Sequence, residues 1–329
     1  MTTRDATTGE APRTKLWRRI LAIPEVGILI PLLLLTGIFY VLQPALLSPG
    51  SVGAMLRGMS FVGLVAVGMT LLMIAGEIDL SVGSVAGLSA IVSAWLMKTA
   101  GWPIWMAVLA GIGTGGAAGL INGLLTVRCG LPAFIATLGM MYVARGLNYL
   151  ICAGYPIYPL PDPLKEFGAA DTLGASWSFI IFIALVVLVD AVMRWTVYGR
   201  KIYATGGNAE VARLAGINTD WIKISCFILT GMLAGLGGIL LMSRINVGQP
   251  EIGMGWELEV IAAVVISGVS LFGGLGTVSG TLLGLAVMQI IRSGLVLSNV
   301  STHWQTVAIG VIMILAVGVD LLRRRAKLS

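Results

Sequence analysis

Two acidic residues, Glu77 and Asp79, form the most conspicuous ionisable pair in the sequence, because long apolar stretches lie on either side of them. Carboxylates within or near a membrane are costly, and many of them serve transport. Asp79 and Ser81 also stand where a helix is expected to begin, and there they can cap its free N–H groups and favour the positive end of its dipole. The sequence leaves two interpretations for Glu77, Asp79 and Ser81: helix capping, or part of a transport path.

A second polar group, Asn122, Arg145 and Asn148, lies within the apolar stretches. These side chains can line a polar path for a solute that crosses the membrane. Arg145 can equally extend its charged end to the outer interface, and Asn122 can form a hydrogen bond between helices, worth about 1 kcal/mol. The acidic residues gather near the ends of the apolar stretches rather than in their middle, which counts against ion-coupled transport.

The sequence contains no set of residues suited to catalysis. Its single histidine, His303, begins an apolar stretch, and its three cysteines do not have the spacing of a metal-binding motif. The phosphate-binding pattern G-x-x-x-x-G-K-[ST] is absent. We therefore expect a protein that is not an enzyme and has no metal or cofactor of its own. Any energy for its work must come from another chain or from an ion gradient.

The composition is that of a membrane protein. Hydrophobic residues make up 57% of the 329 residues and charged residues 11%, with a mean hydropathy of +0.95, whereas soluble domains carry about 25% charged residues. Lipid offers backbone groups no hydrogen-bond partner, so the apolar stretches are expected to be helices. The predicted fold is all-α, with about ten transmembrane helices, some of them broken by Gly or Pro. The predicted spans are residues 26–47, 55–75, 81–98, 103–127, 131–153, 176–193, 222–243, 257–272, 276–297 and 303–322.

Basic residues determine the predicted orientation. With the N-terminus in the cytoplasm, most of the 21 Lys and Arg residues fall on the cytoplasmic side, as the positive-inside rule requires. We expect a cytoplasmic tail over 1–25, a transmembrane domain over 26–322 and a basic cytoplasmic tail over 323–329. The net charge of +6 is explained by this topology, so nucleic acid is not an expected partner.

Residues 196–221 form a polar segment between two apolar spans and are predicted to face the cytoplasm. Asn208 is suited to cap a short helix over 209–215, and Gly216 is suited to end it. Alanines at 209, 212 and 215 would give this helix a flat face that suits docking into a groove. The segment is therefore predicted to bind another protein.

A weak internal repeat relates residues 76–87 to residues 272–284. Each is a Gly-rich turn between two spans, and each leads into the start of a helix. An even number of spans separates them, which gives both copies the same orientation, and pseudo-repeats of this kind are common in transporters.

Three stretches carry a resemblance to a known family: residues 76–84 (GEIDLSVGS), 198–217 (YGRK through GGNAEVARLAGI), and 243–250 (SRINVGQP) leading into 268–277 (GVSLFGGLGT). In these motifs the chain resembles the permease subunits of bacterial ABC importers for ribose, xylose, arabinose and autoinducer-2. The similarity extends over about residues 25–325.

The resemblance implies a dimeric pore in the bacterial inner membrane, homomeric or formed with a second permease. A separate cytoplasmic ATPase subunit, which binds the ATP, would dock on the loop between the sixth and seventh spans. A periplasmic sugar-binding protein would deliver a monosaccharide to the outer loops. Carried over residue by residue, the ATPase-coupling residues are Gly207, Asn208, Glu210, Ala212, Arg213, Ala215 and Gly216.

Three alternatives stay open at this stage. A branched-chain amino acid importer permease shares the general architecture, although the GEIDLSVG form of the first motif favours sugar. An ion-coupled secondary transporter would need no ATPase, and a membrane scaffold would transport nothing.

Overall fold

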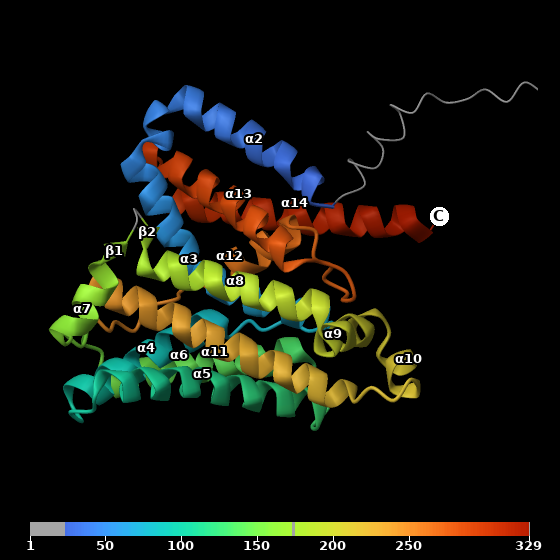
Figure 1. Cartoon of the computed structure of the whole chain (residues 1–329), viewed down its shortest axis with the longest axis horizontal. Coiled ribbons are helices and arrows are strands. Elements are labelled where there is room, and N and C mark those ends of the chain that lie inside the picture. The colour runs from blue at the N-terminus through green and yellow to red at the C-terminus, as the bar shows by residue number, and fades with distance from the viewer. Residues whose placement is uncertain (1–23, 173–174, 329) are drawn as a thin grey trace, which may run out of the picture.

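The computed structural model describes residues 24–172 and 175–328, and in these ranges the chain is almost entirely helical (Figure 1). The elements in order are α2 (Pro24–Leu42), the 3-10 helix η1 (Pro44–Leu47), α3 (Pro49–Ile74), α4 (Val82–Lys98), α5 (Ile104–Val127), α6 (Ala133–Ile151), α7 (Asp162–Ala169), β1 (Asp171–Thr172), β2 (Ala175–Ser176), α8 (Trp177–Trp195), α9 (Val197–Gly207), α10 (Ala209–Leu214), α11 (Thr219–Ile245), α12 (Trp256–Ile266), α13 (Val278–Leu297) and α14 (Thr302–Leu328). The two strands form an antiparallel pair with Asp171 opposite Ser176. The predicted all-α fold of a polytopic membrane protein is confirmed.

Each of the ten predicted spans overlaps a helix, but their lengths differ. Within the described ranges, six helices are long and apolar enough to cross a membrane: α3, α5, α6, α8, α11 and α13. Shorter apolar stretches occur in α2, α4 and α14. The predicted span 257–272 is wrong in its second half, because α12 ends at Ile266 and a turn follows in which Gly268 has φ +88°.

The structure describes little of the predicted N-terminal tail and most of the predicted C-terminal tail. Nearly all of the predicted N-terminal tail, residues 1–25, lies outside the described residues. At the other end, α14 continues as a helix through the predicted basic tail as far as Leu328.

Helices α3 and α11 form the centre of the bundle. The most apolar window of α3 is 83% buried and that of α11 is 61% buried, against 22% for α6 and for α8. Close approach at this centre depends on small residues: a Cβ on Gly231 of α11 would overlap the carbonyl oxygen of Gly115 in α5. Helices in membranes associate through such small-residue contacts, which explains why the 44 glycines are compatible with a helical fold.

Helix α12 is preceded by an irregular segment, residues 246–255, that packs along α4. A Cβ on Gly248 would lie 2.6 Å from Cβ of Ala94, and a Cβ on Gly87 would lie 2.6 Å from the carbonyl oxygen of Ile252. Irregular backbone at membrane depth is tolerated where protein covers it. Pro250, Ile252 and Gly253 of this segment are buried.

Candidate functional site

Helix α10 is a six-residue helix at one end of the bundle, which we call the α10 end (Figure 1). The Asn208 side chain accepts hydrogen bonds from the backbone N–H groups of Glu210 and Val211, each at 3.0 Å. At the other terminus, Gly216 has φ +81° and Ile217 N donates to Ala212 O at 3.0 Å. Asparagine caps and left-handed glycines satisfy the free groups at helix ends. The short helix predicted at 209–215 is therefore present, with both of its termini satisfied.

The exposed face of α10 differs from the predicted alanine face. Ala212 is buried, whereas Val211 is 59% exposed and Leu214 is 85% exposed. Of the two alanines in this helix, Ala212 packs against the neighbouring helices and Ala209 is half-buried. The apolar side chains that a partner can contact are therefore Val211 and Leu214, while Glu210 and Ala215 are also exposed.

Arg213 fixes α10 to the start of α11. Its Nε donates to Thr219 Oγ1 at 2.7 Å, and its Nη2 lies 2.7 Å from Asp220 Oδ1. The Arg213 side chain is 62% exposed, so the ion pair adds little stability. The main effect of these contacts is to orient α10. Only part of the Arg213 side chain remains accessible to a partner.

Helix α9 connects α10 to the rest of the bundle. The hydroxyls of Tyr198 and Ser225 lie 2.7 Å apart, which joins α9 to α11. Tyr203 donates its hydroxyl hydrogen to Gly276 O at 2.7 Å. Burial raises the pKa of the Tyr203 phenol, so the donating proton stays in place.

The acidic turn between α3 and α4 is held by a buried hydrogen-bond network. Asp79 Oδ1 accepts from Ser81 N at 2.7 Å and from Ser81 Oγ at 2.6 Å, and Asn122 Nδ2 donates to Asp79 Oδ2 at 3.2 Å and to Ser81 Oγ at 3.0 Å. The predicted cap by Ser81 is wrong, because Ser81 occupies the N-cap position of α4 without a side-chain cap bond. Its hydroxyl hydrogen goes to Asp79, because a buried carboxylate needs donors. Asn122 of α5 thus bonds to the turn 75–81 and not, as predicted, to another helix.

Glu77 has a separate role. Its Oε1 lies 2.6 Å from Lys223 Nζ, five residues into α11. This ion pair is partly buried, with side-chain exposures of 15% for Glu77 and 22% for Lys223. It joins the turn at 75–81 to the helix that follows α10.

Arg145 and Asn148 lie apart from the Asp79 network. Asn148 is buried and donates to the carbonyl oxygens of Ser84 and Pro250, each at 3.4 Å. Its amide thus bridges α4 and the irregular segment 246–255. Arg145 is half-buried and interacts electrostatically with Glu257 at the start of α12. The six predicted path residues do not form one site in this subunit.

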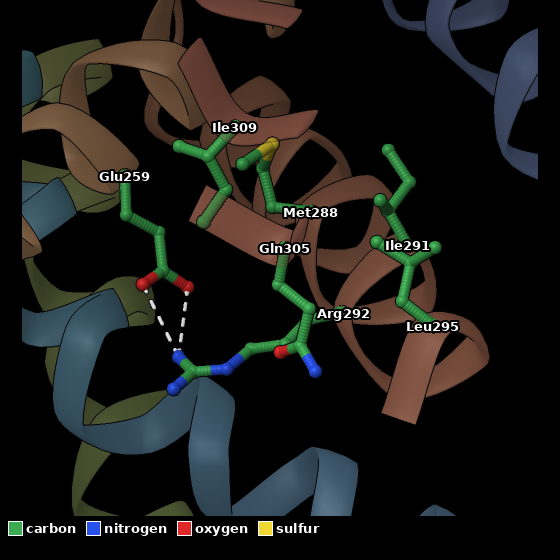
Figure 2. Close-up of a pocket in the computed structure, with 7 residues that line it drawn as sticks. All are labelled: Glu259, Met288, Ile291, Arg292, Leu295, Gln305 and Ile309. Carbon is green, nitrogen blue, oxygen red and sulfur yellow. Dashed lines mark hydrogen bonds and ion pairs between the residues drawn. The ribbon is translucent and has the colours of Figure 1, made fainter. Parts of the chain in front are cut away.

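Sequence reasoning missed an ion pair between α12 and α13. Arg292 Nη1 lies 3.4 Å from Glu259 Oε1 and 3.2 Å from Oε2, beside a small pocket (Figure 2). The pocket is lined by Glu259, Met288, Ile291, Arg292, Leu295, Gln305 and Ile309. Opposite charges within two successive predicted spans, 257–272 and 276–297, are the sequence signal that would have found this pair.

Replacing Glu259 with glutamine should lower the free energy of unfolding by about 1 kcal/mol. The loss is small because the Arg292 side chain is 49% exposed and can turn toward solvent or the membrane interface. Chemical unfolding of the purified chain measures it. The double variant Glu259→Gln with Arg292→Met isolates the pair energy, and strictly additive losses would contradict the interaction.

Comparison with known proteins identifies the family. The family described as "branched-chain amino acid transport system / permease component" matches residues 51–317. The chain belongs to this family. A relative in Azospirillum brasilense, an L-arabinose ABC transporter permease, is 36% identical over 93% of this chain and 90% of its own length. The ribose import permease of Bacillus subtilis is 36% identical over 90% of this chain and 92% of its own length. No solved structure shows a significant match.

Family membership and the apolar helices together make this permease a multi-pass membrane protein and a non-enzymatic transporter subunit. A further relative, the fructose import permease of Rhizobium meliloti, is 35% identical over 80% of this chain and 76% of its own length. The family description refers to amino acids, whereas the names of the Azospirillum and Bacillus relatives, which match most of the chain, refer to sugars.

Proposed function

We propose that this permease is the membrane subunit of an ABC importer that carries a monosaccharide inward across the bacterial inner membrane. The observation that carries the proposal is α10, a helix capped at both ends that presents Val211 and Leu214 at one end of the bundle. An exposed apolar face on a rigid short helix suits insertion into a groove of a partner. The names of the relatives favour a sugar over an amino acid as cargo.

The α10 end faces the cytoplasm in this proposal, and there the coupling residues meet an ATPase subunit that binds the ATP. The start of α2 and the C-terminal end of α14 lie toward the same end as α10 (Figure 1), which supports a cytoplasmic location for both termini. The opposite end would receive a periplasmic sugar-binding protein, and Tyr155 and Tyr158 are exposed in the loop that follows α6. A second permease subunit completes the pore.

The proposed mechanism follows from this arrangement. When the ATPase subunits close on ATP, they displace α10, and the spans connected to it change their packing so that the pore alternates its opening. A partner shifts such an equilibrium only through contacts that differ between the two states. In this scheme α10 makes those contacts. The permease itself needs only a weak affinity for the sugar.

Reconstitution tests the proposal. Liposomes that contain the permease with its co-encoded ATPase and binding protein should accumulate radiolabelled L-arabinose, D-ribose or D-fructose when ATP is supplied on the side of the membrane that carries the ATPase. Uptake should vanish when the ATPase is omitted or ATP is replaced by ADP. Labelled L-leucine is the matched probe for the amino acid alternative. Uptake by the isolated permease under an ion gradient, without ATP, would overturn the proposal.

A further inference from the structure

The C-terminal end of α9 is enclosed by two glycine-rich turns. A Cβ on Gly206 would overlap the carbonyl oxygen of Ile74 and would lie 2.8 Å from the backbone nitrogen of Gly274. The first of these atoms belongs to the end of α3, at the turn 75–81, and the second belongs to the turn 267–277 after α12. These turns contain the first residues of the two copies of the weak internal repeat, 76–87 and 272–284. Gly206 therefore lies beside Gly274 of the second copy, and a Cβ on Gly76 of the first copy would lie 3.8 Å from Cα of Gly206.

The two turns also contact each other at this point. Gly274 N donates a hydrogen bond to Ile74 O at 2.9 Å. A Cβ on Gly273, which has φ +87°, would lie 2.6 Å from Gly206 O and 3.0 Å from the Cα atom of Gly76. Four glycines, Gly76, Gly206, Gly273 and Gly274, thus bring three backbone segments together without side chains between them.

Contacts between backbones transmit displacement in a way that side-chain contacts do not. A side chain can change rotamer and absorb a movement, whereas packed main-chain atoms leave no such freedom. Each turn connects two helices, α3 to α4 and α12 to α13. A movement of the α9 terminus must therefore shift both helix pairs or break the contact.

Neighbouring contacts strengthen the same junction. Tyr203, one helical turn before Gly206 in α9, donates to Gly276 O in the turn 267–277. Lys223 of α11 pairs with Glu77 in the turn 75–81. Only Asn208 separates α9 from α10. Along the backbone, a displacement of α10 reaches the bundle through residues 206–208 on one side and through Ile217 and Asn218 on the other, and the Arg213 contacts with Thr219 and Asp220 also link α10 to α11.

We propose that Gly206 is the positioning residue through which displacement of α10 reaches the helix pairs α3–α4 and α12–α13. The inference rests on the proposed function, because it needs a partner that moves α10. It goes beyond that function by assigning the step between the docking helix and the spans to one backbone junction. Such a claim requires evidence of coupling, since proximity alone does not establish it.

The chain offers a matched pair of variants for the test. Gly206→Ala places a methyl group against Ile74 O, whereas Gly113→Ala in α5 places it in open space with nothing within 4 Å. Each variant is assembled as the full chain with its ATPase subunit. Hydrogen–deuterium exchange is measured with and without ATP plus vanadate, which needs no knowledge of the cargo.

In wild type and in Gly113→Ala, nucleotide should change exchange at residues 209–216 and also at 75–81 and 267–277. In Gly206→Ala, the change at 209–216 should persist while the change at the two turns falls at least about fivefold, and the amount of bound ATPase should stay the same. Equal nucleotide responses of the two turns in Gly206→Ala and wild type would overturn the inference alone. A wild-type complex with no bound ATPase would overturn the proposed function, and this inference with it.

A second pair keeps the test decisive if Gly206→Ala does not fold. Tyr203→Phe removes the hydrogen bond to Gly276 O, whereas Tyr198→Phe removes the hydrogen bonds with Ser225 and Cys226 of α11. We expect the response of turn 267–277 to weaken about two- to tenfold in Tyr203→Phe, the effect of one hydrogen bond, and to be unchanged in Tyr198→Phe. The same response in both variants would contradict transmission through this junction.

Discussion

Replacing Gly216 with valine is expected to uncouple ATP hydrolysis from sugar uptake while leaving membrane insertion intact. Gly216 ends α10 with φ +81°, and a left-handed conformation costs a residue with a Cβ about 1–2 kcal/mol, more for a β-branched one. Helix α10 has six residues, so little helical free energy is available to offset that strain. A strain of this size lowers the population of the formed helix by about five- to thirtyfold, and sugar transported per ATP should fall accordingly.

Gly216→Asn is the matched control, because asparagine adopts the left-handed conformation more readily than other residues with a side chain. A Cβ at position 216 meets nothing within 4 Å, so both substitutions fit sterically and differ mainly in backbone strain. Uptake and ATP hydrolysis are measured on the same reconstituted complexes, with size-exclusion chromatography as the check on folding. Coupled transport by Gly216→Val at the wild-type level would contradict the role of α10 in docking.

The parts of the fold that could be predicted are those governed by local rules. Apolar stretches of sufficient length indicated the positions of the helices. The capping signals at Asn208 and Gly216 indicated where α10 begins and ends. Both rest on interactions within a few residues of the chain. Length alone could not show where a span is interrupted: the stretch 257–272 is apolar throughout most of its length, yet Gly268 and its neighbours form a turn after Ile266.

The parts that could not be predicted depend on contacts between distant segments. The alanine pattern of α10 did not show that Ala212 faces inward, because that depends on how α9 and α11 hold the helix. The irregular segment 246–255 has the composition of a loop, and only its fit against Gly83 and Gly87 of α4 explains why it is buried. The similarity of residues 76–87 and 272–284 was visible in the sequence, whereas their meeting at Gly206 was not.

The Asp79 network joins the turn 75–81 to α5, and it should be the most sensitive polar contact in the bundle. Asn122→Ala removes the donor to Asp79 Oδ2 and to Ser81 Oγ, at 3.2 and 3.0 Å. Asp79 and Asn122 are both buried, at 1% and 0% exposure, so water cannot readily replace the lost amide. A buried acceptor that loses its partner costs about 1–3 kcal/mol, and more when it is charged. We expect the free energy of unfolding to fall by about 3 kcal/mol.

Asn148→Ala provides the comparison, since it makes the same change in the neighbouring helix α6 at a side chain that is also buried. Its amide donates only to the neutral carbonyl oxygens of Ser84 and Pro250, at 3.4 Å each, so its loss should cost less than about 1 kcal/mol. Chemical unfolding of both variants in the same detergent gives the difference. Because turn 75–81 also contacts Gly206, Asn122→Ala should in addition weaken the nucleotide response of that turn, whereas Asn148→Ala should not. Equal losses of stability in the two variants would show that burial of the amide, and not its bond to a carboxylate, determines the effect.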